Sequence, residues 1–324
     1  MKTRLQILIL LMALAGCTPK PITIDIEEQE PRLVIASQVI PDRFMIIVVT
    51  KSFGALQSDP NSDTVSSDIL SNLVVEHARV TVTYRGQTDT LVHLSEAVRN
   101  YVSTMPYPID LSILDLNDSI FFARCIYVST EVLRNAYENY TLNVYDSLTG
   151  LTVSSVASMM QFIPFDSIYP YKNTPSDTTV KLHYSFIDPP GDNYYMLNYY
   201  IRKSDPDYSG LPYNTSAVVS NYTGHPVILI TELISDKLFK DPYVSNDIDL
   251  PDASVNDSLA VTISNISESY YNYLTARKRS GTLFTQIVNE PINYPSNVVN
   301  GYGFFNTQFP DIRLFSLMDM KRAE

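Results

Sequence analysis

The chain has 324 residues, and its 35 acidic residues outnumber its 23 lysines and arginines, which gives a formal net charge of −12. This charge argues against binding to nucleic acid, which needs a basic face, and leaves contact with anionic lipid to an anchor. Only two cysteines are present, so modification of one leaves no internal disulfide. Tyr, Val, Ile and Thr favour strands, and the chain contains 23 Tyr residues.

Residues 1–16 predict a bacterial lipoprotein signal peptide. Lys2 and Arg4 precede an apolar run over residues 5–14, which is too short to span a bilayer as a permanent helix. The run ends in Leu-Ala-Gly-Cys, which resembles the lipobox and places the acylated cysteine at Cys17. Several acyl chains on one residue anchor firmly, where a single chain is marginal. We therefore expect cleavage before Cys17 and a lipid anchor on it; an ordinary signal peptide with a chance cysteine is the alternative.

Residues 17–31 are polar, Pro-containing and acidic, and they predict a tether between the lipid and the folded part. The acidic stretch resembles the surface-export signal of Bacteroidota lipoproteins. The expected location is the cell envelope, lipid-anchored at the outer membrane. The sequence leaves open whether the protein faces the cell surface or the periplasm.

Short strands separated by turns follow over residues 32–163. Pro41-Asp42 and Arg85-Gly86 form two of the turns. The alternation of apolar and polar residues before Arg85 is typical of a strand with one wet side. The expected strands are 32–40, 44–52, 79–84, 87–94, 119–128, 140–145 and 151–159. Seven such strands predict an Ig-like β-sandwich.

Residues 164–324 predict a second β-rich domain that contains a helix near 267–280. Ser267 can cap this helix, Glu268 suits its positive N-terminus, and Gly281 suits its end. The expected strands are 181–187, 194–202, 227–233 and 258–263. The predicted fold class is therefore all-β and mainly antiparallel, with two β-sandwich-like domains and one short helix in the C-terminal half.

Searches for known chemical motifs find no HExxH, Gly-rich phosphate loop, GxSxG or CxxC in the sequence. His77, His93, His183 and His225 are scattered without metal-ligand spacing, although the first two should lie roughly opposite each other on one hairpin. Calcium would suit the acidic turns, but no EF-hand spacing supports it. These turns pair Asp188 with Asp192, Asp236 with Asp241, and Asp247 with Asp249 and Asp252. We expect no catalytic, cofactor or metal site, and a buried, inert Cys125 on a strand.

Asp followed by Ser or Thr, and then by an aliphatic residue or Thr, occurs seven times. This pattern resembles the O-glycosylation motif of exported Bacteroidota proteins, and modification of exposed copies is a hypothesis that the intact mass of the native protein would test. The copies begin at Asp63, Asp89, Asp118, Asp146, Asp166, Asp177 and Asp257.

Six stretches occur in order along the chain: 32–52, the Ile163-Pro164 step, 183–195, 234–239, 266–274 and 290–305. With the lipobox, this ordered set resembles an uncharacterised Bacteroidota lipoprotein family, domain of unknown function 4249. The resemblance implies an outer-membrane lipoprotein, often encoded beside TonB-dependent receptors. It brings no binding residue, so Cys17 is the one predicted site. The segment from Pro295 to Gly303 is most simply a tight loop into a final strand, with a ligand or receptor contact as the alternative.

Three functions are consistent with the sequence. The leading one is a binding or accessory module that is anchored to the membrane through Cys17 and works with a TonB-dependent receptor in ligand uptake. The alternative is a structural or adhesive cell-envelope protein. The third is a hydrolase with an unrecognised site, because a carboxylate pair can hydrolyse glycosides without a local sequence signature. We expect a non-enzymatic protein.

Overall fold

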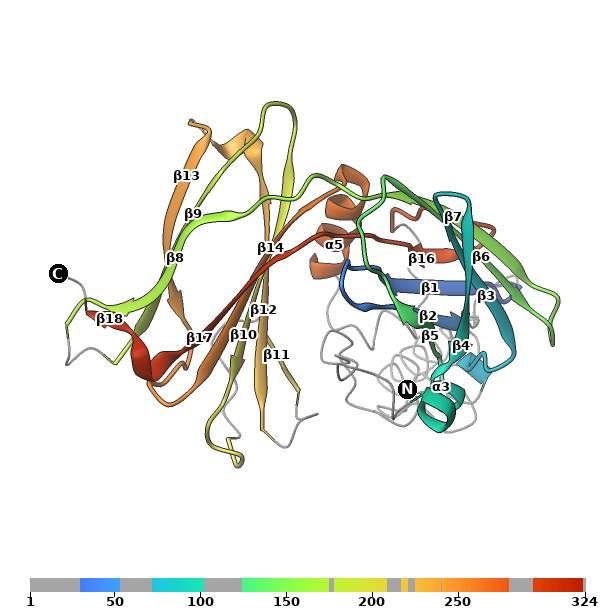
Figure 1. The fold of residues 1–324 in the computed structure, drawn as a ribbon, viewed down its shortest axis with the longest axis horizontal. Coiled ribbons are helices and arrows are strands. Elements are labelled where there is room, and N and C mark those ends of the chain that lie inside the picture. The colour runs from blue at the N-terminus through green and yellow to red at the C-terminus, as the bar shows by residue number, and fades with distance from the viewer. Residues whose placement is uncertain are drawn as a thin grey trace, which may run out of the picture.

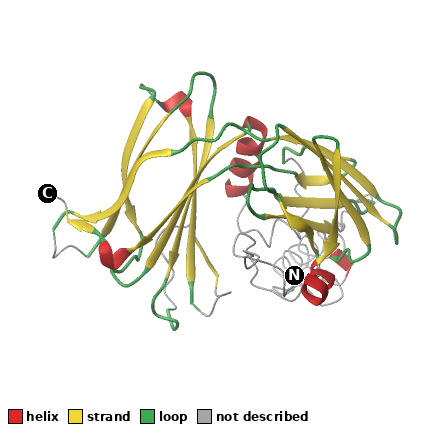
Figure 2. Ribbon diagram, in the orientation of Figure 1, coloured by secondary structure: helices red, strands yellow, loops and turns green. Residues whose placement is uncertain are grey.

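The computed structural model describes residues 30–52, 72–101, 124–174, 178–208, 217–220, 225–239, 241–279 and 294–322. Residues 1–29, with the predicted signal peptide, the lipid anchor Cys17 and most of the tether, lie outside this described part. So do Gly281 and the motif copies at Asp63, Asp118 and Asp177. The described chain is mainly antiparallel sheet gathered around two buried cores, which confirms the predicted all-β, mainly antiparallel class (Figures 1 and 2). The first part is one curled sheet and not the predicted Ig-like sandwich of two sheets.

A nine-stranded sheet forms the first part, in the order β15-β7-β6-β3-β4-β5-β2-β1-β16. The bounds are β1 (Leu33–Gln38), β2 (Phe44–Lys51), β3 (Ala78–Tyr84), β4 (Gln87–His93), β5 (Ile126–Val132), β6 (Asn139–Asp146), β7 (Thr152–Ser158), β15 (Val298–Val299) and β16 (Tyr302–Phe304). The helix α3 (Leu94–Tyr101) follows β4 directly. Leu94 and Ala97 are buried one turn apart on it, so this helix has an apolar face that the sequence reading did not identify.

The nine-stranded sheet curls until its strands share one core (Figure 1). The alternation of side chains in β3 shows this: Val80 and Val82 point inward and are fully buried, while their neighbours Thr81 and Thr83 are partly exposed. Tyr140 from β6 is buried in the same core. The core is therefore made by the inward-facing set of residues from each strand.

Two smaller sheets pack face to face in the second part. One has the order β11-β12-β10-β14-β17 and the other β13-β9-β8-β18. The bounds are β8 (Phe165–Lys172), β9 (Val180–Ile187), β10 (Tyr194–Arg202), β11 (Ala217–Ser220), β12 (Val227–Ser235), β13 (Tyr243–Leu250), β14 (Ser258–Ile266), β17 (Asp311–Ser316) and β18 (Lys321–Arg322). Two short 3-10 helices, η3 (Asp236–Leu238) and η4 (Leu317–Asp319), lie in the connections. Large buried residues such as Tyr184, Phe186 and Tyr199 fill the space between the sheets.

Two strands from beyond residue 163 join the first sheet rather than the second. β15 pairs with β7, and β16 pairs in parallel with β1. Gly303 makes the β1 contact close: its φ is +87°, and a Cβ there would overlap the carbonyl oxygen of Ile35. The turn before it is completed by Asn300, whose φ is +63°. The segment is a tight turn into a strand, as predicted, but β16 is not the final strand, because β17 and β18 follow it.

The helix α5 (Glu268–Arg279) agrees with the predicted helix and lies between the two cores (Figure 1). Tyr270 and Tyr273 contact Phe304 of β16, with ring centroids 5.0 and 5.2 Å apart. On its other side Tyr271 contacts Tyr194 of β10, at 5.0 Å. The aromatic rings of α5 therefore join the two parts. Within the described residues, no helix has both the length and the apolar character needed to cross a membrane.

Candidate functional site

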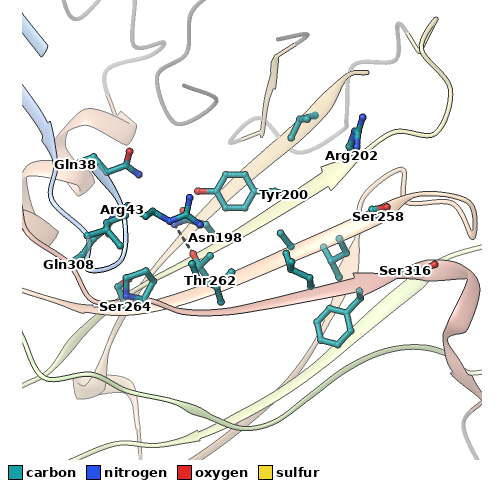
Figure 3. A pocket seen from close by; sticks show the side chains of 18 residues that line it. Gln38, Arg43, Asn198, Tyr200, Arg202, Ser258, Thr262, Ser264, Gln308 and Ser316 are labelled. Atoms are coloured by element: carbon teal, nitrogen blue, oxygen red, sulfur yellow. Dashed lines mark hydrogen bonds between the residues drawn. The ribbon is translucent and has the colours of Figure 1, made fainter. Parts of the chain in front are cut away.

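A groove of about 540 Å³ lies where the first part faces the outer surface of the five-stranded sheet (Figure 3). Its volume falls within the range of roughly 300–1,000 Å³ that is usual for small-molecule sites. Gln38, Ile40 and Arg43, from the end of β1 and the turn into β2, form one wall. Strands β10, β14 and β17 form the floor.

Period-two alternation in β10 and β14 explains which side chains reach the groove. Leu197, Tyr199 and Ile201 enter the second core, so Asn198 and Tyr200 between them project from the opposite face. In β14 the same pattern sends leucine, valine and isoleucine inward and sends small residues to the groove. These small residues are Ser258, Ala260, Thr262 and Ser264.

Strand register aligns the floor residues in rows across the three strands. The rows are Asn198–Thr262–Ile312, Tyr200–Ala260–Leu314 and Arg202–Ser258–Ser316. The floor thus has the buried amide of Asn198 at one end and the guanidinium of Arg202 at the other, with Tyr200, Ala260 and Leu314 between them.

Asn198 is held in a fixed orientation on this floor. Its Oδ1 accepts a hydrogen bond from Thr231 Oγ1 at 2.7 Å, and its Nδ2 donates to Thr262 Oγ1 at 3.3 Å, so both ends of the amide are engaged (Figure 3 shows the second bond). Because flanking strands hold both ends, the amide is a rigid part of the surface rather than a mobile side chain.

Three buried polar atoms of the groove lining have no hydrogen-bond partner among the described residues. They are Gln308 Oε1, Ser264 Oγ and Gln38 Nε2. Gln308 is 9% exposed and Ser264 is 1% exposed. A buried polar group without a hydrogen bond destabilises the folded protein by about 1–3 kcal/mol. A hydrogen bond from these atoms to a molecule in the groove would remove that cost.

Gln308 reaches the groove because the chain crosses there from one part to the other. After β16, residues 305–310 run beside β1 before entering β17. Ser37 Oγ accepts from the backbone N–H of Asn306 at 2.6 Å, and the N–H of Gln308 donates to Val39 O at 3.0 Å. These bonds fix the crossing segment against the wall that carries Gln38 and Arg43.

Charge distinguishes the groove from the rest of this acidic chain. Among the described residues that line the groove, Arg43 and Arg202 carry a charge and none is Asp or Glu. Among the described residues, neither arginine makes an ion pair with a carboxylate. The groove is therefore locally cationic within a protein whose net charge is −12.

A buried ion pair fixes the end of the groove that carries Arg202. Lys203, the first residue after β10, places its Nζ 2.6 Å from Asp257 Oδ2, and both side chains are nearly inaccessible. Asp257 also accepts from the N–H groups of Ser204 and Ser254. Burial acts to raise the pKa of the Asp257 carboxyl, but these hydrogen bonds outweigh it and hold the pKa below its ordinary value. The negative charge of Asp257 is thus compensated by Lys203.

The structure does not bring the histidines together. His93 bonds to Ser95 Oγ and to a backbone carbonyl, His183 contacts Asp247 at 3.1 Å, and His77 is exposed. Over the described ranges, no group of three His, Cys, Asp or Glu side chains has a metal-binding arrangement. Cys125 is fully buried, in the turn just before β5 rather than on the strand itself, and burial raises the pKa of its thiol to about 12.

The acidic turns use their carboxylates to hold backbone and side chains. Asp236 accepts from the N–H of Asn193 at 2.5 Å, and Asp241 accepts from the N–H of Tyr243 at 2.8 Å. Asp188 accepts from the hydroxyl of Tyr195. Asp188, Asp236 and Asp241 thus bond to groups of their own loops and adjoining strands, whereas Asp247 and Asp249, expected in an acidic turn, lie on strand β13 beside His183 and Lys181.

None of the residues that line the groove is predicted as a binding site from the sequence. One signal was present: the alternation in β14 puts serine, alanine and threonine on the face that a two-sheet sandwich would leave wet, which is ordinary for an exposed surface. The wall that covers this face comes from residues more than 200 positions earlier, and no local pattern marks that contact.

Fold and groove together define a mainly antiparallel β-protein with two cores and a cationic groove between them. The chain matches the model of a protein family, Domain of unknown function (DUF4249), over residues 19–308. It belongs to this family. No curated protein matches the chain.

Solved structures with some likeness to the chain are distant. Salmonella alpha-2-macroglobulin is 11% identical over 77% of this chain and 15% of its own, with a TM-score of 0.22. The native Escherichia coli alpha-2-macroglobulin is 10% identical over 76% and 14%, also at 0.22. The BSP domain of a biofilm associated protein is 11% identical over 94% and 62%, at 0.19. The chain spans only about 15% of the macroglobulins, and at these TM-scores the likeness carries no functional argument.

Proposed function

We propose that the protein is a lipid-anchored outer-membrane lipoprotein that binds a small ligand in the groove and works with a TonB-dependent receptor in its uptake. The groove carries the binding part of this proposal, because it combines a suitable volume, apolar floor residues and buried polar atoms that have no hydrogen-bond partner in the described part of the chain. The anchor and the receptor rest on the lipobox at Cys17 and on the family resemblance.

A hydrolase gains no support from the groove. Glycoside hydrolysis needs two carboxyl groups on either side of the scissile bond, and none of the described residues that line the groove is Asp or Glu. The binding role uses what the lining does offer: guanidinium groups, amides, hydroxyls and apolar side chains.

Affinity purification tests the receptor part. The tagged, lipidated chain is isolated from gently solubilised outer membrane, and co-purifying proteins are identified by mass spectrometry. We expect a TonB-dependent receptor in stoichiometric amount. The Cys17→Ala variant, which lacks the anchor, controls for proteins that bind the tag or the resin. Recovery of the protein alone, or with surface polymer, would favour a structural or adhesive role instead.

A groove-filling variant tests the binding part. Ala260→Trp places a large ring on the floor of the groove, whereas Val156→Trp places the same ring at an exposed position of β7. Ligand uptake or ligand binding should be lost with the first variant and kept with the second. Equal behaviour of the two variants would contradict the assignment of the groove.

A further inference from the structure

We propose that the groove selects a small organic anion: an apolar body that carries a carboxylate, sulfonate or phosphate group, together with groups that can donate or accept hydrogen bonds. This inference rests on the proposed binding function and adds the chemical class of the ligand. It follows from the charge, the register and the unpaired atoms of the groove.

The charge argument starts from Arg43 and Arg202. A guanidinium is always ionised and presents its donors in a planar fork that matches carboxylate and phosphate oxygens. Neither arginine is neutralised by a carboxylate in the described residues, and the lining adds no acidic side chain. Asp257, which directly precedes the lining residue Ser258, is already paired with Lys203. An anion that enters the groove thus meets two arginines that form no ion pair with a carboxylate of the described residues.

The position of the two arginines sets how the anion would lie. Arg202 is at one end of the floor, in the row with Ser258 and Ser316. Arg43 comes from the opposite wall and points over the sheet toward Asn198 and Thr262 (Figure 3). Asp42, the residue before Arg43, has a left-handed conformation with φ at +60° and so forms part of the turn that leads into β2. A ligand held by Arg43 would contact both parts of the protein.

The rest of the lining describes the body of the ligand. Ile312, Leu314 and Phe315 from β17 offer apolar contact along one side. Gln308 Oε1 and Ser264 Oγ, buried and without partners among the described residues, offer hydrogen bonds to hydroxyl or amide groups. A bare inorganic anion would leave these contacts unused, which is why the inference specifies an organic anion.

Two matched probes test the inference without knowledge of the natural ligand. 1-Anilinonaphthalene-8-sulfonate and N-phenyl-1-naphthylamine share an aromatic body and differ by the sulfonate. The mature chain with Cys17→Ser carries no lipid, so both titrations can be made by fluorescence without detergent. We expect saturable binding of both probes, with a Kd for the sulfonate about tenfold lower. The reason is that hydrogen bonds from arginine to a sulfonate are charge-assisted and therefore stronger than those between neutral groups.

Variants separate charge from shape. Arg43→Gln and Arg202→Gln should each weaken binding of the sulfonate about threefold to tenfold and change binding of the neutral probe less than about twofold. Arg79→Gln removes one positive charge from an exposed position of β3, outside the groove, and should leave both probes unchanged. Arg43→Lys, which keeps the charge, should recover part of the loss, and this excludes misfolding as the cause.

Two other results have distinct meanings. Equal affinity for the two probes, unaffected by Arg43→Gln and Arg202→Gln but abolished by Ala260→Trp, would overturn the anionic selectivity and leave the binding function standing. Absence of saturable binding of either probe, or binding that Ala260→Trp does not affect, would overturn both the selectivity and the assignment of the groove.

Discussion

The side-chain amide of Asn297 bonds to both backbone groups of Phe305. Its Nδ2 donates to Phe305 O at 2.7 Å, and its Oδ1 accepts from Phe305 N at 2.8 Å. A single side chain therefore takes the place of a neighbouring strand at the point where the chain leaves β16. This bond pair holds the start of the segment that later carries Gln308 into the groove.

Replacing Asn297 should test that role directly. Asn297→Ala leaves two part-buried backbone groups unpaired, and we expect the free energy of unfolding to fall by about 2 kcal/mol. Urea denaturation gives the value. Asn135→Ala, which removes an exposed amide whose bond to Tyr137 is long at 3.4 Å, should cost less than about 0.5 kcal/mol. Equal losses for the two variants would show that the amide of Asn297 has no special structural role.

Gly303→Ala should be much more costly than an ordinary glycine substitution. The added methyl group would overlap the backbone of Ile35 in the parallel pair of β1 and β16. Gly150→Ala is the matched control, because Gly150 also has a positive φ, at +75°, but has open space around it. We expect about 1 kcal/mol for Gly150→Ala and at least about 3 kcal/mol for Gly303→Ala, measured by thermal or urea unfolding. Similar values would mean that β16 can move away from β1 without penalty.

The pair of Lys203 and Asp257 should be sensitive to loss of one partner. Lys203→Met leaves the buried carboxylate of Asp257 without its counter-charge, so the free energy of unfolding should fall by about 3 kcal/mol. Lys181→Met breaks the pair with Asp249, whose side chain is 68% exposed, and should change stability by less than about 0.5 kcal/mol. Urea unfolding at pH 7 compares the two. A small effect of Lys203→Met would show that the site relaxes enough to hydrate Asp257.

The same site predicts a pH dependence. The pKa of Asp257 is lower in the folded protein than its ordinary value, so the carboxylate stabilises the fold fully above the unfolded pKa of about 3.9 and loses that contribution as the pH falls through the folded pKa. The difference in free energy of unfolding between wild type and Asp257→Asn should therefore be largest near pH 7 and shrink below about pH 4. A difference that stays constant from pH 7 to pH 3 would contradict the lowered pKa.

Much of the fold could be predicted because its signals are local. Arg85 and Gly86 both have positive φ and close the hairpin of β3 and β4, as their sequence indicated. Ser267 accepts from the N–H of Tyr270 at 3.3 Å, so the predicted cap of α5 is confirmed. In each case the residue types within a few positions decide the conformation.

The remainder depends on contacts between distant parts of the chain. β15 and β16 contain two and three residues, too few for a periodic pattern, and their partners are about 140 and 270 positions away. Arg43 and Arg202 likewise meet one groove only after both parts have folded. Sequence patterns describe which face of a strand is wet, but they do not indicate what covers that face.

The pairing of β1 with β16 also affects the order in which the chain can fold. If the chain is exported from its N-terminus, β1 emerges first and can pair with β2, but its partner on the other edge, β16, begins only at Tyr302. Until then β1 presents an open edge, with unpaired backbone groups that invite pairing with other chains. The first sheet therefore stays incomplete until β16 is available, although β17 and β18 of the second part come later still, so folding of an exported chain would be completed late. A chain truncated before Tyr302 should accumulate as aggregate rather than as a folded half.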